Sequence, residues 1–468
     1  MKIRSSAPED RRDGAAKELR PLADLDAVAE ACERALEHSV YDEVELLWIE
    51  SRSRRLAHGG KDETTITPRF EREGHAAMQV RVREGGRQGV YRTDSWLPAA
   101  LETAIRSAGA QAVRRTSTKR CPALPGADDG ELPSCESLHD PELATLDQAE
   151  AMELVGSLLG DDEAAVLDWH EARILVANSH GVRRGARLTA RLAQVRSGAD
   201  GSRAGFASDA SRRLDPQGLR GLFEIARSRR PADGDNGAPA SGQALQGPVV
   251  LAPEATAQLV DLLNHRAFAA DACRSGQSFL RLHTGVQVFD DRVTIHDDGT
   301  KQEGLPLPFD LEGRSKFSVA LVERGVPRTP TVDTFSAHEL GVEPTASCVG
   351  GQHAFGLHLF REPGSLSEEE LLQQCDGGVW ISRLQRIECF HPERMLVRAH
   401  GRGVRRIADG RLDHPLPEVL WEDSLLRVFS DIRGIARRLA RRPSSDGFLG
   451  GITAPTVGIA SVDRLEVL

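Results

Sequence analysis

The chain has 468 residues, 40% of them hydrophobic and 28% charged, so it can bury a sizeable core and is not globally disordered. Its net charge of −10 disfavours a nucleic-acid-binding protein, and no stretch approaches the about 18 unbroken apolar residues of a membrane span. The seven cysteines are scattered without a Cys-x-x-Cys pair, and the N-terminus lacks the apolar stretch of a secretory signal. We therefore expect a reduced, cytoplasmic protein without a nucleic-acid or membrane partner.

Residues 1–20 are expected to be a disordered charged tail, and residues 21–120 an N-terminal α/β domain with antiparallel strands and helices. Helical spacing of apolar residues predicts a helix over residues 22–38, and a second, alanine-rich helix follows at residues 96–113. Apolar residues alternate with polar ones in two runs that indicate strands: Val44, Leu46 and Trp48, then Met78, Val80 and Val82. Gly85 and Gly86 predict a tight turn after the second run.

Residues 121–245 are interpreted as linker sequence and a middle domain. Two stretches rich in Pro, Gly and Asp, residues 118–141 and 231–247, have the composition of linkers. Between them the pattern predicts a helix, a strand pair and a second helix, at residues 147–159, 169–195 with a turn at 178–181, and 215–228.

Residues 246–468 consist mainly of short strand-like runs and turns, which predicts a strand-rich, barrel-like C-terminal domain. Helices are expected near residues 254–275, 366–374 and 422–440. The predicted fold class of the whole chain is therefore α+β. Three short basic runs, at residues 114–120, 227–231 and 437–443, are interpreted as solvated surface and helix ends.

Six landmarks, in order along most of the chain, resemble those of the TldD/PmbA family, the modulator-of-gyrase type of metallopeptidase pair. They occupy residues 86–94, 178–181, 247–260, 297–326, 362–381 and 447–459. The resemblance implies a two-subunit zinc metalloprotease that cleaves unfolded peptides inside a closed chamber. One subunit type carries zinc on a His-Glu-x-x-x-His helix with a cysteine supplied near the C-terminus, and the TldE/PmbA type lacks these ligands.

Carried onto this sequence, the zinc motif falls on Asp261, Leu262 and Arg266. Leucine has no lone pair to serve as a general base, and the guanidinium of arginine cannot ligate a metal. Residues 437–451, where the resemblance would place the cysteine, contain none. The resemblance therefore implies a non-catalytic subunit without its own cofactor, which forms a heterodimer with a zinc-bearing TldD-like subunit and binds unfolded peptide.

Two other functions stay open at this point. Asp261 and His265 are four residues apart and share a helical face, and Cys389 and His391 share a strand face, so a relocated metal site would make the chain a peptidase on its own. A stand-alone peptide-binding scaffold is the third reading. The stretch 384–397 stands where the family tends to have a glycine-rich loop, which leaves the partner surface and the substrate open.

Five further polar residues are candidates for loop fixation or for lining a peptide or partner surface. The five residues are His265, Asp297, Asp298, Asp310 and Glu312. The four carboxylates belong to the turn-rich landmark at residues 297–326, which lacks the spacing of an EF-hand calcium loop.

Overall fold

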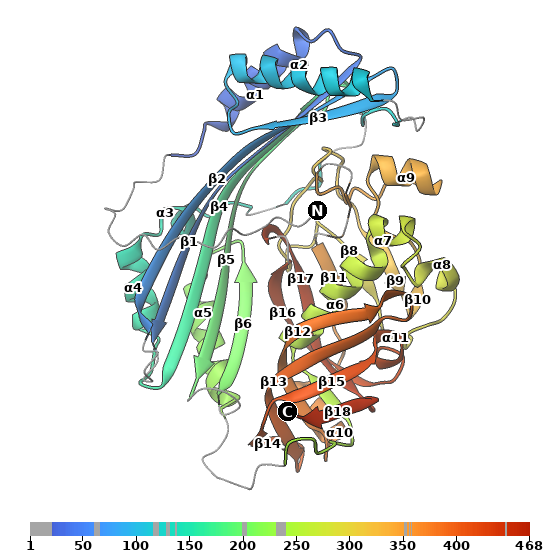
Figure 1. Ribbon diagram of the computed structural model, residues 1–468. Helices are drawn as coiled ribbons and strands as arrows, with labels where there is room; N and C mark the ends of the chain where they lie inside the picture. Colours follow the sequence, from blue (N-terminus) through green and yellow to red (C-terminus); the bar gives the residue numbers. More distant parts are fainter. Residues whose placement is uncertain are drawn as a thin grey trace.

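The computed structural model describes residues 21–59, 66–115, 121–127, 132–135, 138–198, 204–230, 240–350, 353–354, 356, 358–444 and 447–468. The tail expected at residues 1–20 lies outside this range. The described residues form an N-terminal unit, residues 21–230, and a C-terminal unit, residues 240–468, each built around one large sheet (Figure 1). Helices and strands are mixed in both units, which confirms the α+β class.

The N-terminal unit contains a six-stranded antiparallel sheet of order β3-β2-β1-β4-β5-β6. Its strands are β1 (Glu43–Gly59), β2 (Ile66–Glu84), β3 (Arg87–Thr93), β4 (Glu163–Asn178), β5 (Arg183–Ser197) and β6 (Gly205–Ser211). Its helices are α1 (Leu25–Glu37), α2 (Pro98–Arg114), α3 (Pro141–Thr145), α4 (Gln148–Gly156) and α5 (Pro216–Ser228). The predicted turns at residues 85–86 and 178–181 join β2 to β3 and β4 to β5.

The division into separate N-terminal and middle domains differs from the structure. β1 pairs with β4 along almost its whole length, from Glu45 opposite Asn178 to Gly59 opposite Ala164. The expected linker at residues 118–141 also contributes contacts, because the backbone N–H of Leu124 donates to the Glu43 carboxylate at 2.7 Å. Residues 21–230 therefore share one sheet, and the long-range pairing that unites them leaves no local pattern in the sequence.

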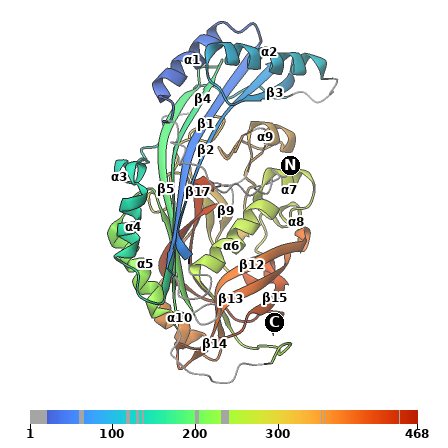
Figure 2. The ribbon, with the colours of Figure 1, turned by 60° about the vertical axis from the view of Figure 1, so that its left-hand side comes forward.

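All five helices of the N-terminal unit cover the same face of its sheet. Side chains alternate between faces along a strand, and Leu46 and Trp48 of β1 pack under α1 and α2 while Leu56 packs under α3 to α5. Leu47 points to the other face, which we call the inner face, and lies in a cluster with Phe309 of the C-terminal unit. Figure 2 shows the helices on one side of the sheet and the C-terminal unit on the other.

The C-terminal unit contains a twelve-stranded mixed sheet of order β10-β9-β8-β11-β17-β7-β12-β13-β15-β18, with β14 beside β13 and β16 beside β17. Its strands are β7 (Val249–Leu251), β8 (Ile295–Asp297), β9 (Val319–Glu323), β10 (Val326–Pro327), β11 (His358–Arg361), β12 (Val379–His391), β13 (Leu396–Ala408), β14 (Arg411–Leu416), β15 (Val419–Ser424), β16 (Ile432–Ser444), β17 (Gly447–Ile459) and β18 (Arg464–Val467). β10 and β18 do not pair with each other, so among the described residues this sheet is open and not a closed barrel.

The helices of the C-terminal unit are short. They are α6 (Pro253–Leu263), the π-helix η2 (Asn264–Phe268), α7 (Ala270–Arg274), α8 (Leu280–His283), α9 (Thr334–Leu340), α10 (Glu368–Gln374), the 3-10 helix η3 (Pro392–Arg394) and α11 (Leu425–Val428). The helix expected near residues 366–374 is confirmed as α10. Among the described residues, no helix combines the length and apolar composition that crossing a membrane requires.

The prediction of a helix near residues 422–440 is wrong. Only residues 425–428 are helical, as α11, and residues 432–444 form β16, which pairs antiparallel with β17. Leu, Ala and Arg favour a helix locally, but pairing with a buried strand outweighs that preference. The basic run at residues 437–443 is therefore part of a strand and not a helix end.

Candidate functional site

Helix α6, on which the family resemblance would place the zinc motif, packs its apolar side into the core of the C-terminal unit. Leu259 and Leu263 are fully buried there, as is Ala267 in the following π-helix. Asp261 and His265 lie on the opposite, partly exposed side, with 3.4 Å between His265 Nε2 and Asp261 Oδ1. The two side chains therefore share one helical face, as their spacing predicts.

A π-helix follows α6 at the position of the motif's second half. Its first residue, Asn264, is fully buried, and its side chain donates to the Gly356 carbonyl and accepts from the Gly356 N–H, both at 2.8 Å. Arg266, which occupies the second histidine position, is exposed. π-Helical turns interrupt the regular register of a helix and often occur at functional sites. Here the turn is fixed in place by Asn264.

The residues proposed for a relocated metal site form no group of three possible ligands in the part of the chain that the structure describes. Among the described residues, one group of three or more His, Cys, Asp or Glu side chains has ligand atoms close enough for a metal ion, and it contains none of Asp261, His265, Cys389 and His391. Burial raises the pKa of the Cys389 thiol, although the nearby charge of Arg266 lowers it, so the neutral thiol is favoured. This part of the molecule offers the pair Asp261–His265 and two cationic neighbours, Arg266 and Arg442.

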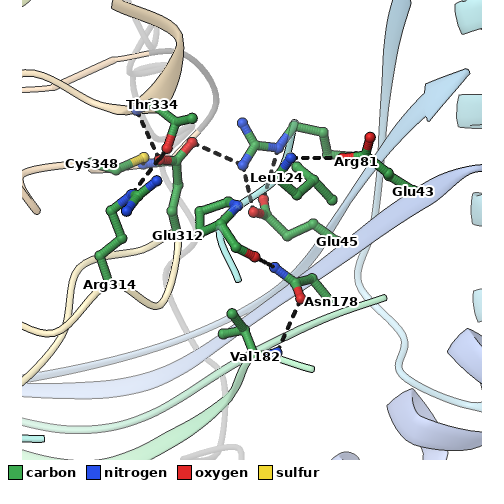
Figure 3. A network of polar contacts seen from close by, with 12 residues as sticks. Glu43, Glu45, Arg81, Leu124, Asn178, Val182, Glu312, Arg314, Thr334 and Cys348 are labelled. Atoms are coloured by element: carbon green, nitrogen blue, oxygen red, sulfur yellow. Dashed lines mark hydrogen bonds and ion pairs between the residues drawn. The ribbon is translucent and has the colours of Figure 1, made fainter. Parts of the chain in front are cut away.

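The second candidate region is a buried network where the two units meet (Figure 3). Arg81 of β2 donates through Nε to Glu45 of β1 at 3.0 Å and through a terminal nitrogen to Glu312 of the C-terminal unit at 2.9 Å. All three side chains are at most 4% exposed. The second oxygen of Glu312 accepts from the backbone N–H and the hydroxyl of Thr334, at 3.0 and 2.6 Å. We call Glu45, Arg81 and Glu312 the junction triad.

The charges of the junction triad depend on one another. Burial favours the neutral form of Glu312, but the Arg81 charge and the hydrogen bonds from Thr334 outweigh it, so the pKa of Glu312 is lowered. Burial raises the pKa of Glu45 above its ordinary value despite Arg81. Burial also raises the pKa of the neighbouring Asp333, with a further contribution from the charge of Glu312. The Arg81 guanidinium thus stabilises the ionised form of Glu312 and also donates a hydrogen bond to Glu45.

The group with metal-ligand spacing is Glu312, Asp333 and Cys348, whose ligand atoms lie within 4.8 Å of one another. Two carboxylates and a thiolate suit a divalent transition metal. However, both oxygens of Glu312 already accept hydrogen bonds, one of them from the cationic Arg81, and a metal ion bound there would repel the guanidinium. Burial raises the pKa of the Cys348 thiol well above its usual range. This arrangement favours a structural connection between the units.

The acidic residues proposed for lining a surface are instead buried inside the fold. Asp297 accepts from Lys316 at 2.8 Å and from Ser347 at 2.7 Å, and Asp298 accepts from the hydroxyl of Thr300 at 2.6 Å. Exposed fractions of the four carboxylates do not exceed 4%: Asp297, Asp298, Asp310 and Glu312. They hold loops and the junction between the units, and they present no accessible surface because other parts of the chain cover them.

Asp310 fixes the loop that carries Glu312. Its carboxylate accepts from three backbone N–H groups, those of Glu312, Arg314 and Cys348, each at 3.0 Å. Burial and the charge of Glu312 raise the pKa of Asp310 to about 7, although these N–H donors oppose the shift. The landmark at residues 297–326 therefore shapes a loop that reaches the inner face of the N-terminal sheet.

Sequence reasoning missed four members of this region: Glu45, Arg81, Asp333 and Cys348. Glu45 and Arg81 lie on two strands that were predicted, on the inner face, which is opposite the face of Leu46 and Val80. Alternation makes these two positions polar, so no local pattern indicated that the C-terminal unit buries them. Asp333 and Cys348 stand in turn-rich sequence and carried no signal either.

The comparisons with known proteins agree with this fold. Residues 244–464 match the family model described as PmbA/TldA metallopeptidase C-terminal domain. The chain is 28% identical over 192 residues to a protein of Methanothermobacter thermautotrophicus named metalloprotease. The aligned stretch covers 40% of this chain and 42% of that protein. The chain is 32% identical over 115 residues to an uncharacterized protein of Methanocaldococcus jannaschii, covering 24% of this chain and 28% of that one. The chain thus matches less than half the length of each of these relatives.

Two solved structures share the fold over almost their whole length. TldE from Thermococcus kodakarensis has a TM-score of 0.76 at 19% identity, covering 94% of this chain and 100% of that one. A Thermotoga maritima protein described as a candidate modulator of a DNA gyrase has a TM-score of 0.76 at 18% identity, covering 93% and 99%. Identities this low show the fold alone. The family model thus identifies residues 244–464 as a C-terminal domain of the PmbA/TldA metallopeptidase type, and the two structures show that the whole chain shares their fold.

Proposed function

We propose that this chain is the non-catalytic, TldE/PmbA-like subunit of a two-subunit cytoplasmic metalloprotease. It would pair with a zinc-bearing TldD-like subunit, complete the chamber and bind unfolded peptide there. The observation that carries the proposal is the chemistry of α6 and the π-helix, where Asp261, Leu262 and Arg266 stand at the ligand and base positions of the motif. A leucine accepts no proton, and an arginine ligates no metal.

The inner face of the N-terminal sheet supports a role in peptide binding. Beyond the apolar cluster that contains Phe309, one part of this face is polar and only partly buried, with Ser51 and Ser53 half-buried and Arg55 exposed beside Asp168. No helix of the described chain packs on this side of the sheet. A polar, solvated sheet face enclosed on one side by a second unit suits contact with an extended peptide.

Free strand edges supply a second means of holding a peptide. β16 pairs with β17 on one side only. On its other side, the Arg437 N–H donates to the Leu366 carbonyl at 2.7 Å and the Ala436 carbonyl accepts from Gly364 at 3.0 Å. Further along this edge, the Arg441 N–H donates to the Asp209 carboxylate of β6 at 3.3 Å, so only part of the edge lacks a partner among the described residues. A peptide added as a strand would need only backbone hydrogen bonds.

Co-expression with a TldD-like zinc subunit tests the proposal. We expect the two chains to co-purify as a heterodimer, and the pair to cleave unfolded casein in a zinc-dependent reaction. This chain alone should be inactive, and a pair in which the zinc subunit has lost its motif glutamate should be inactive as well. Zinc-dependent cleavage by this chain alone would overturn the non-catalytic assignment.

The alternative of an independent metallopeptidase draws on the name of the Methanothermobacter relative and on the group Glu312, Asp333 and Cys348. Elemental analysis of the purified chain separates the two functions. Stoichiometric zinc or iron that is lost in Cys348→Ser would favour the independent enzyme. A homodimer that binds peptide but recruits no zinc subunit would favour the stand-alone scaffold.

A further inference from the structure

The polar face of α6 continues in both directions from Asp261. Glu254, Gln258, Asp261 and His265 follow one another at i, i+4, i+7 and i+11, so they form one stripe along the helix. Gln258 is committed to β12, because its side chain donates to the Leu384 carbonyl at 2.6 Å and accepts from the Leu384 N–H at 2.8 Å. The charged members of the stripe, Glu254 and Asp261, are therefore the ones that act on neighbouring strands.

Glu254 lies among four arginines that come from two strands, β12 and β16, and from the end of α5. It acts electrostatically on Arg229, Arg383, Arg438 and Arg442. One of its oxygens accepts from the Ser208 N–H at 2.9 Å, and the other lies 3.7 Å from Arg229 without a hydrogen bond. Arg229 also pairs with Glu368 at 3.1 Å. The charge of Arg229 is therefore already balanced by Glu368.

The other three arginines, Arg383, Arg438 and Arg442, form what we call the arginine cluster. Arg383 lies over the Phe206 ring at 4.7 Å, and Arg442 lies near both Asp261 and Glu254. Within the described part of the chain, neither Arg438 nor Arg442 has an ion pair or a hydrogen bond from its guanidinium. Both come from the basic run of β16 that the sequence assigned to solvated surface.

The nearby carboxylates form their ion pairs with other arginines. Arg229 pairs with Glu368, Arg441 with Asp209 at 2.9 Å, and Arg402 with Glu418. Glu368 and Asp209 also act electrostatically on Arg438, and Glu418 acts on Arg383, but none of these carboxylates forms an ion pair with Arg438 or Arg442 in the described chain. The surrounding protein lowers the pKa of each arginine in the cluster by desolvation, yet Arg438 is exposed and the other two are half-buried. Cationic groups that are desolvated but reachable by solvent suit an incoming anion.

We propose that the arginine cluster recognises the carboxylate side chains of acidic peptide segments. A guanidinium binds a carboxylate through two parallel hydrogen bonds, and such charge-assisted pairs are among the strongest polar contacts. Arg438 and Arg442 lie on β16 and Arg383 on β12, and Glu254 of α6 acts on all three. The inference rests on the proposed function in one respect, because it requires unfolded peptides to reach this face. It adds a substrate class: peptides rich in Asp and Glu.

The test compares two short labelled peptides with amidated ends, one carrying several Glu residues and the other Gln at the same positions. Binding to the full-length chain is followed by fluorescence anisotropy at low and at moderate salt. We expect the acidic peptide to bind more tightly, and Arg438→Gln/Arg442→Gln to weaken its binding by about tenfold or more while leaving the Gln peptide unaffected.

The matched control is Arg433→Gln/Arg437→Gln, which removes two exposed charges from the same strand. It should leave the preference for the acidic peptide unchanged. Circular dichroism verifies folding, and if the glutamine pair misfolds, Arg438→Lys/Arg442→Lys takes its place and should weaken binding several-fold.

Equal binding of the two peptides by the native chain, or an unchanged preference in the Arg438/Arg442 variant, would overturn the inference while leaving heterodimer formation and casein cleavage intact. Tighter binding of a single-stranded oligonucleotide than of the acidic peptide would also overturn it. Absence of both peptide binding and the heterodimer would refute the proposed function as well.

Discussion

The junction triad and the arginine cluster use the same two side-chain types in opposite ways. At the junction, Arg81 is enclosed and bonded to two carboxylates from different parts of the chain. Over α6, Arg438 and Arg442 remain reachable by solvent and have no ion pair within the described chain. Satisfied, buried charges specify how segments meet, whereas unsatisfied, accessible charges are available to a ligand. The contrast predicts that substitutions at the first site affect stability and those at the second affect binding.

The largest expected effect is that of Arg81→Met. Removing the guanidinium leaves Glu45 and Glu312 buried without a cation, which costs about 3–5 kcal/mol of unfolding free energy. Urea denaturation followed by circular dichroism measures the loss. Arg34→Gln, which removes one member of the exposed Glu30–Arg34 pair, should change stability by less than about 0.5 kcal/mol. Equal losses in the two variants would contradict the structural role of the junction.

An intermediate effect is expected for Asp333→Asn, and it depends on pH. Burial and Glu312 raise the pKa of Asp333 in the folded state, so from about pH 4 upward the unfolded chain loses this proton first. The native chain then loses stability as pH rises toward the folded pKa, and the always neutral asparagine does not. Relative to the native chain, Asp333→Asn should therefore gain stability as pH rises from about 4 to 7.

Asparagine also preserves the cap of α9, in which Asp333 accepts from the Ser336 N–H at 2.7 Å. Asp333→Ala removes both charge and cap, so the difference between the two variants at one pH measures the cap alone. Urea titrations at several pH values provide the comparison. A stability difference between Asp333→Asn and the native chain that stays constant with pH would argue against this assignment.

The smallest effect is expected for Asp261→Asn on the polar face of α6. Its partner His265 is 3.4 Å away and partly exposed, and Asp261 also acts on Arg442, so losing the carboxylate should cost no more than about 1 kcal/mol. Asp297→Asn is the matched comparison in the same unit, because Asp297 is fully buried against Lys316 at 2.8 Å and its substitution should be far more costly. Comparable losses in the two variants would erase the distinction between the two regions.

The sequence predicted the parts of this molecule that depend on local patterns. Alternation at Val44, Leu46 and Trp48 identified both β1 and its buried face, and the glycines at 85 and 86 identified a turn. Once the family resemblance had located the zinc motif, its substitution by Asp261, Leu262 and Arg266 was also visible in the sequence. Long-range pairing was not visible: β1 meets β4 across about 120 residues of sequence, and β16 is a strand only because β17 lies beside it.

The sites divide in the same manner. Asp310 and Glu312 stood out in a recognisable landmark, yet their burial depends on Arg81, which lies 231 positions from Glu312. The basic run at residues 437–443, on β16, was interpreted from the sequence as solvated surface and a helix end. Its significance comes from the neighbouring carboxylates, which are already taken by Arg229, Arg402 and Arg441. Which charges lack partners is a property of the whole fold, and no single segment records it.

The junction triad has a further consequence for the polypeptide as a covalent object. Because Arg81 and Glu312 form an ion pair sealed from water, and Leu47 and Phe309 add apolar contact beside it, the two units are joined by more than the peptide bonds between them. A protease that cut between residues 230 and 240 would leave two fragments that stay associated. We expect a gene divided at that point to encode two halves that reassemble. The contacts at the junction would then hold the fold together without a continuous backbone.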